Sequence, residues 1–203
     1  MQNLETQFDV SRETLSLLES YVELLRKWNK RINLVSVSSL QRVWERHIWD
    51  SVQLYPLAKD GDVWVDIGSG GGLPGIVAAV LARQHHPARR ITLVESDNRK
   101  AIFLRTVIRE LKLPAFVLAD RIENQENLQA DILTARALTD LSELLTHAKN
   151  HLKPSGTALF HKGETWKKEL DTAKALWSFS GKVHKSITNP SAAILEIKEV
   201  RSV

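Results

Sequence analysis

One stretch, residues 63–76, constrains the fold of this chain more than any other. It reads Val-Trp-Val-Asp-Ile-Gly-Ser-Gly-Gly-Gly-Leu-Pro-Gly-Ile. The short apolar run at its start is typical of a parallel strand buried on both faces. Glycines follow, which permit positive φ and let a ligand approach the backbone, and Pro74 suits the first turn of a helix. The stretch therefore predicts a strand, a glycine turn and a helix.

The same alternation continues to the end of the chain. From Asp62 onward, apolar runs typical of strands alternate with segments of helical periodicity, which indicates a mostly parallel α/β sheet. We expect strands at residues 63–67, 91–95, 116–119, 132–135 and 158–161, and two more near 183–187 and 194–200. We expect helices between them at residues 75–84, 98–111, 141–151 and 165–176.

Residues 1–60 lack this alternation and predict a helical cap that precedes a domain of residues 61–203. Ser11 suits the N-cap of a first helix. Ser38 and Gln41 have the spacing of a capping box, which predicts a second helix to about Tyr55. His47 and Asp50 fall on the apolar stripe of that second helix, where polar groups need partners or a function.

Composition excludes several classes of protein. The chain has no cysteine, which removes disulfides, thiolate metal sites and thiolate catalysis. No apolar run approaches the length of a membrane span, and the polar, acidic segment Met1–Val10 does not resemble a signal peptide. The net charge of +4 is compatible with nucleic acid. We expect a cytoplasmic protein with no metal site and no membrane association, and a monomer.

Two readings of the glycine turn compete. Gly70, Gly72 and Gly75 match the fingerprint G-x-G-x-x-G of dinucleotide-binding proteins, and Glu95 follows at the distance of a ribose ligand. A nicotinamide-dependent oxidoreductase is therefore one hypothesis. Asp66 favours another, because a carboxylate at the end of the first strand would face the crevice where α/β proteins bind ligands. It would repel a pyrophosphate and attract the cationic S-adenosylmethionine.

Acidic residues recur at the ends of three successive predicted strands. Asp66 ends the first, Glu95 the second, where it could accept hydrogen bonds from ribose hydroxyls, and Asp120 follows the third, where an adenine would lie. Each acid alone is more often a solvated loop residue. Together with the glycines they favour S-adenosylmethionine over a dinucleotide.

These motifs resemble those of the bacterial small-subunit ribosomal RNA (guanine-N7)-methyltransferase G family, also called glucose-inhibited division protein B. The specific parts are Leu-Pro-Gly at residues 73–75 and Arg-His-Ile-Trp-Asp-Ser at residues 46–51. The resemblance also covers residues 28–34, 121–123, 136–137 and 162–163, and Lys100, Phe103 and Leu104. The chain departs from the family pattern at residues 191–194, Ser-Ala-Ala-Ile, where many members carry a basic residue.

The resemblance implies a Rossmann-like class I methyltransferase fold with S-adenosylmethionine as cofactor. It further implies methylation of N7 of guanine 527 of 16S rRNA, to give 7-methylguanosine in the small ribosomal subunit. The cofactor contacts that it implies are Gly68, Leu73, Ile122, Glu123 and Arg136, in addition to Asp66, Gly70, Glu95 and Asp120 from the strand ends. Whether the substrate is naked rRNA or an assembled subunit stays open, and so does a ribosome-binding module with a degenerate cofactor site.

Guanine N7 is a lone-pair nucleophile with no proton to lose, so its methylation needs positioning but no general base. The candidates for orienting the base are Arg136, Lys162, His47 and Asp50. Their alternative is structural: Arg136 in a salt bridge, Lys162 in solvent, and either His47 and Asp50 as a satisfied core pair or Asp50 in an i,i+4 ion pair with Arg46. Basic and polar residues that could contact RNA are Arg31, Asn33, Arg46, Lys100 and Lys162.

Overall fold

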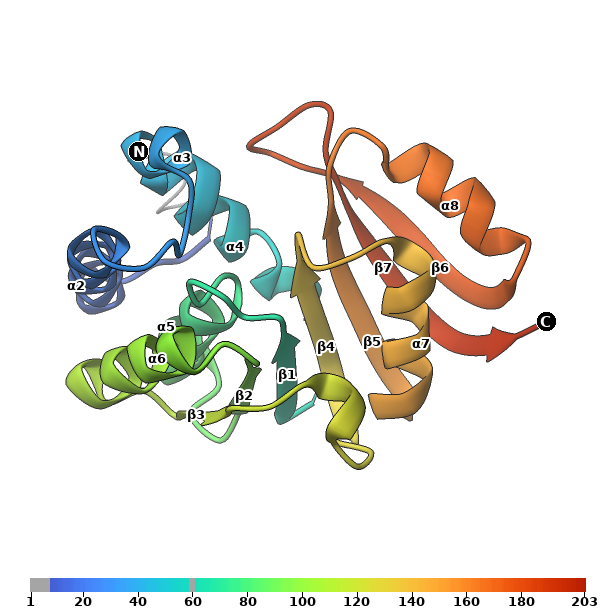
Figure 1. Ribbon diagram of the computed structural model, residues 1–203, viewed down its shortest axis with the longest axis horizontal. Helices are drawn as coiled ribbons and strands as arrows, with labels where there is room; N and C mark the ends of the chain where they lie inside the picture. Colours follow the sequence, from blue (N-terminus) through green and yellow to red (C-terminus); the bar gives the residue numbers. More distant parts are fainter. Residues whose placement is uncertain (1–7, 59–60) are drawn as a thin grey trace.

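A seven-stranded sheet of order β3-β2-β1-β4-β5-β7-β6 carries the fold in this computed structural model, which describes residues 8–58 and 61–203 (Figure 1). β1 to β5 are parallel, whereas β7 runs antiparallel to both of its neighbours. The chain order reverses between β1 and β4, and in such sheets ligands bind at the carboxyl ends of the strands at this point. The strands are β1 (Val63–Ile67), β2 (Arg90–Val94), β3 (Ala115–Leu118), β4 (Ala130–Arg136), β5 (Leu152–Lys162), β6 (Trp177–Lys185) and β7 (Ala193–Ser202).

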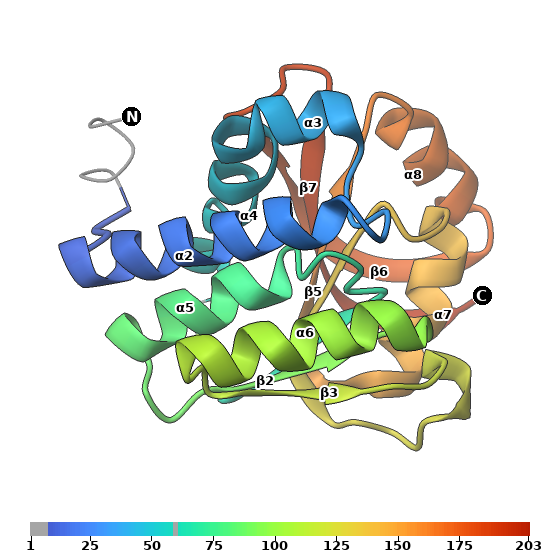
Figure 2. The ribbon, with the colours of Figure 1, turned by 60° about the vertical axis from the view of Figure 1, so that its left-hand side comes forward.

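Helices cover both faces of the sheet. α5 (Gly75–His85) and α6 (Asn98–Leu111) lie on one face, and α7 (Leu141–His151) and α8 (Trp166–Lys174) lie on the other (Figures 1 and 2). A 3₁₀ turn, η3 (Ile122–Asn124), follows β3. Trp64 and Val65 of β1 alternate between the two hydrophobic cores under these helices, as side chains of a strand do.

The N-terminal residues form a helical cap over the α5–α6 face. It consists of α2 (Arg12–Asn29), α3 (Val37–Gln41), the π-helix η1 (Trp44–Trp49), α4 (Asp50–Val52) and the 3₁₀ turn η2 (Tyr55–Leu57). α2 packs against α5 and α6 (Figure 2). Trp28 of α2 contacts Phe103 of α6, with ring centroids 5.7 Å apart. Cap residues such as Leu18 and Ile48 belong to the same hydrophobic core as Trp64 and Ile76 of the sheet domain.

The predicted fold class is confirmed, since the sheet is mostly parallel, has helices on both faces and carries an N-terminal helical cap. β1, α6 and α7 begin and end at the predicted residues. β5 and β6 begin six residues earlier than predicted, at Leu152 and Trp177. Residues 1–7 and 59–60 lie outside the described residues, so most of the polar segment 1–10 and part of the predicted boundary cannot be placed, and the division into two domains stays a prediction.

The second cap helix differs from its prediction in two ways. Ser36, not Ser38, is the N-cap, because its hydroxyl accepts a hydrogen bond from the Ser39 amide. The helix also does not run unbroken to Tyr55: α3 ends at Gln41, and a π-helix follows from Trp44 to Trp49. None of the helices in residues 8–58 and 61–203 is both long and apolar enough to cross a membrane.

Candidate functional site

The glycine loop after β1 turns its backbone amides inward. Gly68 has a φ of +63°, a conformation that disfavours residues with a side chain. The Gly70 amide donates to the Glu95 carboxylate at 2.7 Å, and the Gly72 and Leu73 amides donate to the Ser69 carbonyl. A dinucleotide pyrophosphate is held by free loop amides, and these amides already have acceptors. The loop geometry therefore disfavours a dinucleotide as the ligand.

Asp66 holds this loop from within the protein. Its side chain is 0% exposed; it accepts hydrogen bonds from the Gly75 amide at 3.2 Å and from the Thr134 hydroxyl at 2.7 Å. Asp66 and Thr134 are register partners on β1 and β4. Burial raises the pKa of the Asp66 carboxyl to about 6. The expectation that this carboxylate faces the crevice is wrong, because the side chain is buried and its partners are Thr134 of β4 and the Gly75 amide. A direct cofactor contact stays an untested prediction.

Glu95 lies between the glycine loop and the start of α6. One carboxylate oxygen accepts from Gly70 and the other accepts from the Asp97 amide at 2.8 Å. A carboxylate offers about four lone-pair sites, so each oxygen retains one for a further donor such as a ribose hydroxyl. Asp120 is exposed and accepts from the Arg121 amide and from the side chains of Asn124 and Gln125. It thereby orders the turn that carries two of the predicted contacts, Ile122 and Glu123.

A first hollow, of about 220 Å³, lies at the ends of β1, β2 and β3. We call it the strand-end hollow; it is lined by Gly68, Val94, Ser96, Arg121, Ile122, Glu123, Leu138, Thr139, Glu143 and His147. A Cβ on Gly68 would lie 2.5 Å from Leu138, which shows how closely the two residues approach. Glu123, Glu143 and His147 bring their ligand atoms within 4.8 Å of one another, so the expectation of no metal site also stays a prediction.

The cap contributes directly to the glycine loop. The hydroxyl of Tyr21, buried on α2, donates to the Gly71 carbonyl at 2.5 Å. A Cβ on Gly71 would lie 3.3 Å from the Leu34 carbonyl, so the loop and the cap approach closely. Leu73 is buried in the same core, where its side chain fixes the loop; its predicted contact with the cofactor is not tested by this geometry.

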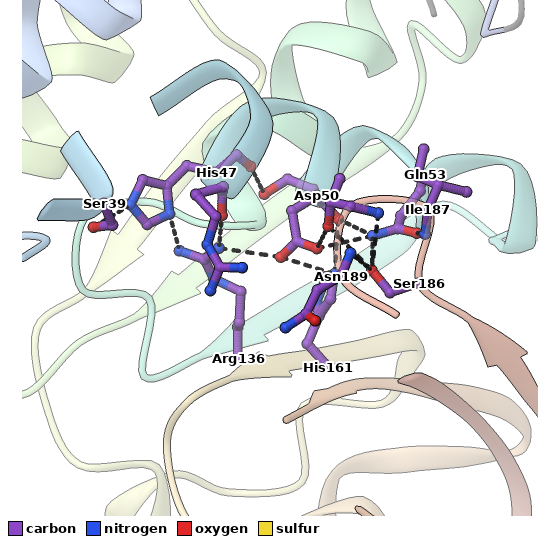
Figure 3. Close-up of polar contacts among 12 residues, drawn as sticks. Ser39, His47, Asp50, Gln53, Arg136, His161, Ser186, Ile187 and Asn189 are labelled. Carbon is purple, nitrogen blue, oxygen red and sulfur yellow. Dashed lines mark hydrogen bonds and ion pairs between the residues drawn. The ribbon is translucent and has the colours of Figure 1, made fainter. Parts of the chain in front are cut away.

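A second hollow, of about 340 Å³, lies between the cap and the ends of β4 and β5. We call it the cap-side hollow; Arg136 is one of its lining residues, and Figure 3 shows the polar contacts of Arg136. The Arg136 guanidinium donates to the Arg46 carbonyl at 3.1 Å, to Asp50 at 3.3 Å and to His47 Nδ1 at 2.8 Å. These contacts use three of its five N–H donors.

His47 is neutral in this arrangement. Arginine can only donate, so Nδ1 of His47 must be the acceptor, and the proton on Nε2 is donated to the Ser39 hydroxyl at 2.9 Å. Burial, followed by the charge of Arg136, lowers the pKa of His47 to about 4. The ring therefore fixes the position of the guanidinium and carries no charge near neutral pH.

Asp50 joins the cap to both β4 and the loop between β6 and β7 (Figure 3). Its carboxylate accepts from Arg136, from the Thr188 hydroxyl at 2.6 Å and from the Gln53 amide at 2.9 Å. The alternative of an Arg46–Asp50 ion pair is wrong, because Asp50 pairs with Arg136. The structural reading of Arg136, as a salt-bridge partner, is confirmed in this state.

His161 completes the cluster, and the sequence reasoning missed it. It ends the predicted fifth strand and is the register partner of Arg136, which places the two at the same sheet edge. Its Nε2 donates to the Asp50 carbonyl at 2.8 Å, and its Nδ1 is buried without a hydrogen-bond partner in the described part of the chain. Burial lowers its pKa. The signal that could have revealed it was a polar residue at the end of the strand that pairs with the strand of Arg136.

Lys162 lies on the wall of the cap-side hollow but is not in solvent. It is 9% exposed, donates to the Thr139 carbonyl at 2.9 Å and forms an ion pair with Glu169 of α8 at 2.5 Å. The structural alternative of a solvated lysine is wrong, because Lys162 is buried and Glu169 and a backbone carbonyl compensate its charge. Its RNA contact stays a prediction, as do those of Arg31, Asn33, Arg46 and Lys100; of these four, Lys100 is half-buried and the others are exposed.

Comparisons with known proteins point to one family. A family model described as "rRNA small subunit methyltransferase G" (GidB) matches residues 14–197. The chain is 51% identical to a protein named "Ribosomal RNA small subunit methyltransferase G" from Ruegeria pomeroyi, over 96% of both chains. It is 50% identical to a protein of the same name from Paracoccus denitrificans, over 95% of this chain and 98% of the other.

Solved structures share the fold at low sequence identity. A crystal structure of a mutant of MtNAS in complex with S-adenosylmethionine is 17% identical, with a TM-score of 0.60 over 98% of this chain and 83% of that chain. A SAM-dependent methyltransferase from Aquifex aeolicus is 13% identical, also with a TM-score of 0.60, over 76% of this chain and 91% of the other. At this identity the likeness concerns the fold alone.

Proposed function

Because the chain belongs to the rRNA small subunit methyltransferase G family, it is an S-adenosylmethionine-dependent enzyme that methylates N7 of a guanine in 16S rRNA, and we propose that the crevice at the ends of β1, β4 and β5 is its active site. The observation that carries this proposal is the pair of hollows on either side of residues 137–138. They adjoin one another at the point where the chain order of the sheet reverses.

The residues at the strand-end hollow fit S-adenosylmethionine. Ile122 offers an apolar wall, and Glu95, which lies between the lining residues Val94 and Ser96, retains acceptor sites for ribose hydroxyls. Loop amides that donate to the protein suit a cofactor without phosphate. When bound, the cofactor supplies a methyl group on a cationic sulfur.

The cap-side hollow would hold the guanine. Two N–H groups of Arg136 remain beyond its contacts with Arg46, His47 and Asp50. If they bind the base, they should donate to O6, since the bidentate contact that arginine usually makes with guanine would occupy the N7 lone pair that attacks the methyl group. Neutral His47 and the Asp50 side chain hold the guanidinium, so the site positions the base and needs no proton acceptor.

The target nucleotide and the partner are proposed from the family resemblance and from the net charge of +4. We propose guanine 527 as the target and the small ribosomal subunit or its rRNA as the partner. The relatives are named methyltransferases, and neither an oxidoreductase nor a ribosome-binding module with a degenerate cofactor site is supported by them.

The test is methyl transfer from labelled S-adenosylmethionine to small subunits and to protein-free rRNA, with the modified nucleotide mapped. We expect 7-methylguanosine at one position. Binding of NAD(H) without binding of S-adenosylmethionine would refute the proposal, and so would RNA binding with no methyl transfer. Comparison of the two substrates shows which one the enzyme recognises.

A further inference from the structure

A third hollow, of about 480 Å³, lies on the outer side of the cap, between the last turns of α2 and α3. We call it the α2–α3 hollow; it is lined by Arg26, Asn29, Lys30, Val37, Leu40 and Gln41. None of these residues lines the cap-side or the strand-end hollow. Figure 2 shows α3 lying alongside the C-terminal half of α2.

The shape of this hollow is fixed by Asn29. Its side-chain oxygen accepts from the Leu34 and Val35 amides, both at 2.9 Å, and its side-chain nitrogen donates to the Val35 carbonyl at 3.0 Å. These three bonds hold the connection between α2 and α3. Asn29 therefore fixes how α3 follows α2, and the side chains of both helices line the hollow between them.

The chemistry of the hollow is mixed. Val37 is 74% exposed, more than any other large apolar side chain of the described residues except Val203, and Leu40 is half-buried. Arg26 and Lys30 are exposed at the rim and form no ion pair within the described residues. Apolar side chains beside two exposed cations suit a ligand that has both a flat apolar face and negative charge.

The position of the hollow identifies that ligand. α3 separates it from the proposed active site: Val37 and Leu40 line the α2–α3 hollow, whereas Ser39 lines the cap-side hollow and accepts a hydrogen bond from His47. An RNA strand whose guanine enters the cap-side hollow therefore needs to pass only one short helix, α3, to reach the α2–α3 hollow. A nucleotide of that strand has a base face for Val37 and Leu40, and its phosphates suit Arg26 and Lys30.

We propose that the α2–α3 hollow binds a nucleotide of the rRNA strand that flanks the target guanine, with its phosphates at Arg26 and Lys30. This inference rests on the proposed function. The contrary explanation is structural, since cations in the last turn of a helix interact favourably with its dipole. The two explanations differ in what they predict for RNA affinity and its dependence on salt.

The test uses the double variant Arg26→Gln/Lys30→Gln in the full-length protein. We expect a raised KM for RNA, an unchanged kcat at saturating RNA and an unchanged affinity for S-adenosylmethionine. Two lost phosphate contacts should reduce the slope of log K against log salt by about 1.4 to 1.8. The matched control is Lys182→Gln/Arg201→Gln, which removes two charges from exposed positions on the edge strand β6 and its neighbour β7.

A second variant, Val37→Ser, tests the apolar side chains of the hollow. It should weaken RNA binding and leave the salt slope unchanged, because no charge is removed. Unaltered RNA affinity in both variants, or an equal loss in the control, would overturn the inference while wild-type methyl transfer leaves the proposed function standing. If Arg26→Gln/Lys30→Gln weakens binding to the assembled subunit but not to protein-free rRNA, the hollow binds a ribosomal protein and the inference is wrong.

Discussion

The two tyrosines of the chain offer a matched test of the link between the cap and the glycine loop. Tyr21 donates to the Gly71 carbonyl inside the core, whereas Tyr55 bonds to Nδ1 of His86 at 2.9 Å, away from the loop. Tyr21→Phe and Tyr55→Phe remove the same hydroxyl and leave no cavity of methylene size. Any difference between the two variants therefore reports on what the hydroxyl holds.

The expected magnitude follows from burial. Tyr21→Phe leaves a buried carbonyl without its donor, which costs about 1–3 kcal/mol in the free energy of unfolding. In a chain of this length, each kcal/mol lowers the melting temperature by about 2–4 °C. The glycine loop also loses its hydrogen bond to the cap, although its bonds to Glu95 and Asp66 remain. If cofactor binding must then supply about 1–2 kcal/mol to order the loop, cofactor affinity decreases by about 5–30-fold.

The assays are chemical denaturation and isothermal titration with S-adenosylmethionine. Tyr55→Phe should leave cofactor affinity unchanged and cost at most about 1.5 kcal/mol in stability, the value of an ordinary hydrogen bond. If Tyr21→Phe binds the cofactor like the wild type, the cap does not order the loop. An equal loss of affinity in Tyr55→Phe would show that general destabilisation is responsible.

Two further changes test the two hollows. His47→Asn should flatten the pH dependence of stability between pH 6.5 and about 4: the folded pKa of His47 is lowered to about 4, so its contribution is present above pH 6.5 and is lost as the pH falls through 4. The pKa of Asp66 is raised to about 6, so protonation of Asp66 stabilises the folded protein as the pH falls and offsets the effect of His47. Denaturation curves of variant and wild type should therefore be compared at pH 7.5 and 5.5. Gly68→Ala should lower cofactor affinity at least about tenfold, because φ at Gly68 is +63° and the new Cβ meets Leu138. The control is Gly163→Ala, whose Cβ would have open space. Equal cofactor affinities of the two variants would refute the placement of the cofactor.

The sequence predicted the sheet and most of its helices because their signals are local. β1 is an apolar run followed by glycine, and α6 begins at an N-cap aspartate and continues with helical periodicity. The second cap helix was harder to predict. Ser36, Ser38 and Ser39 are all suitable caps, and only backbone geometry chooses Ser36. A π-helix has no periodicity of its own that a sequence reading would detect.

The sequence predicted where the site residues lie on the sheet, but it did not predict which residues they bond to. The strand ends brought Asp66, Glu95 and Arg136 to one edge, as expected from a parallel sheet. The direction of the Asp66 carboxylate depends on Thr134 of β4, and the burial of Lys162 depends on Glu169 of α8. Those pairings join different elements, so no spacing in the sequence reveals them. His161 was missed because its partner is a backbone carbonyl of the cap.

The bonds of Asp50 have a consequence for the order in which the protein is completed during synthesis. The Asp50 carboxylate accepts from Thr188, 138 residues further along the chain, and Gln53 accepts from the Ile187 amide. The cap is translated first, yet these two contacts require the loop between the last two strands. A chain that stops before residue 186 could form the parallel strands but would leave Asp50 without Thr188. The cap-side hollow is therefore finished only when the last hairpin has emerged and folded.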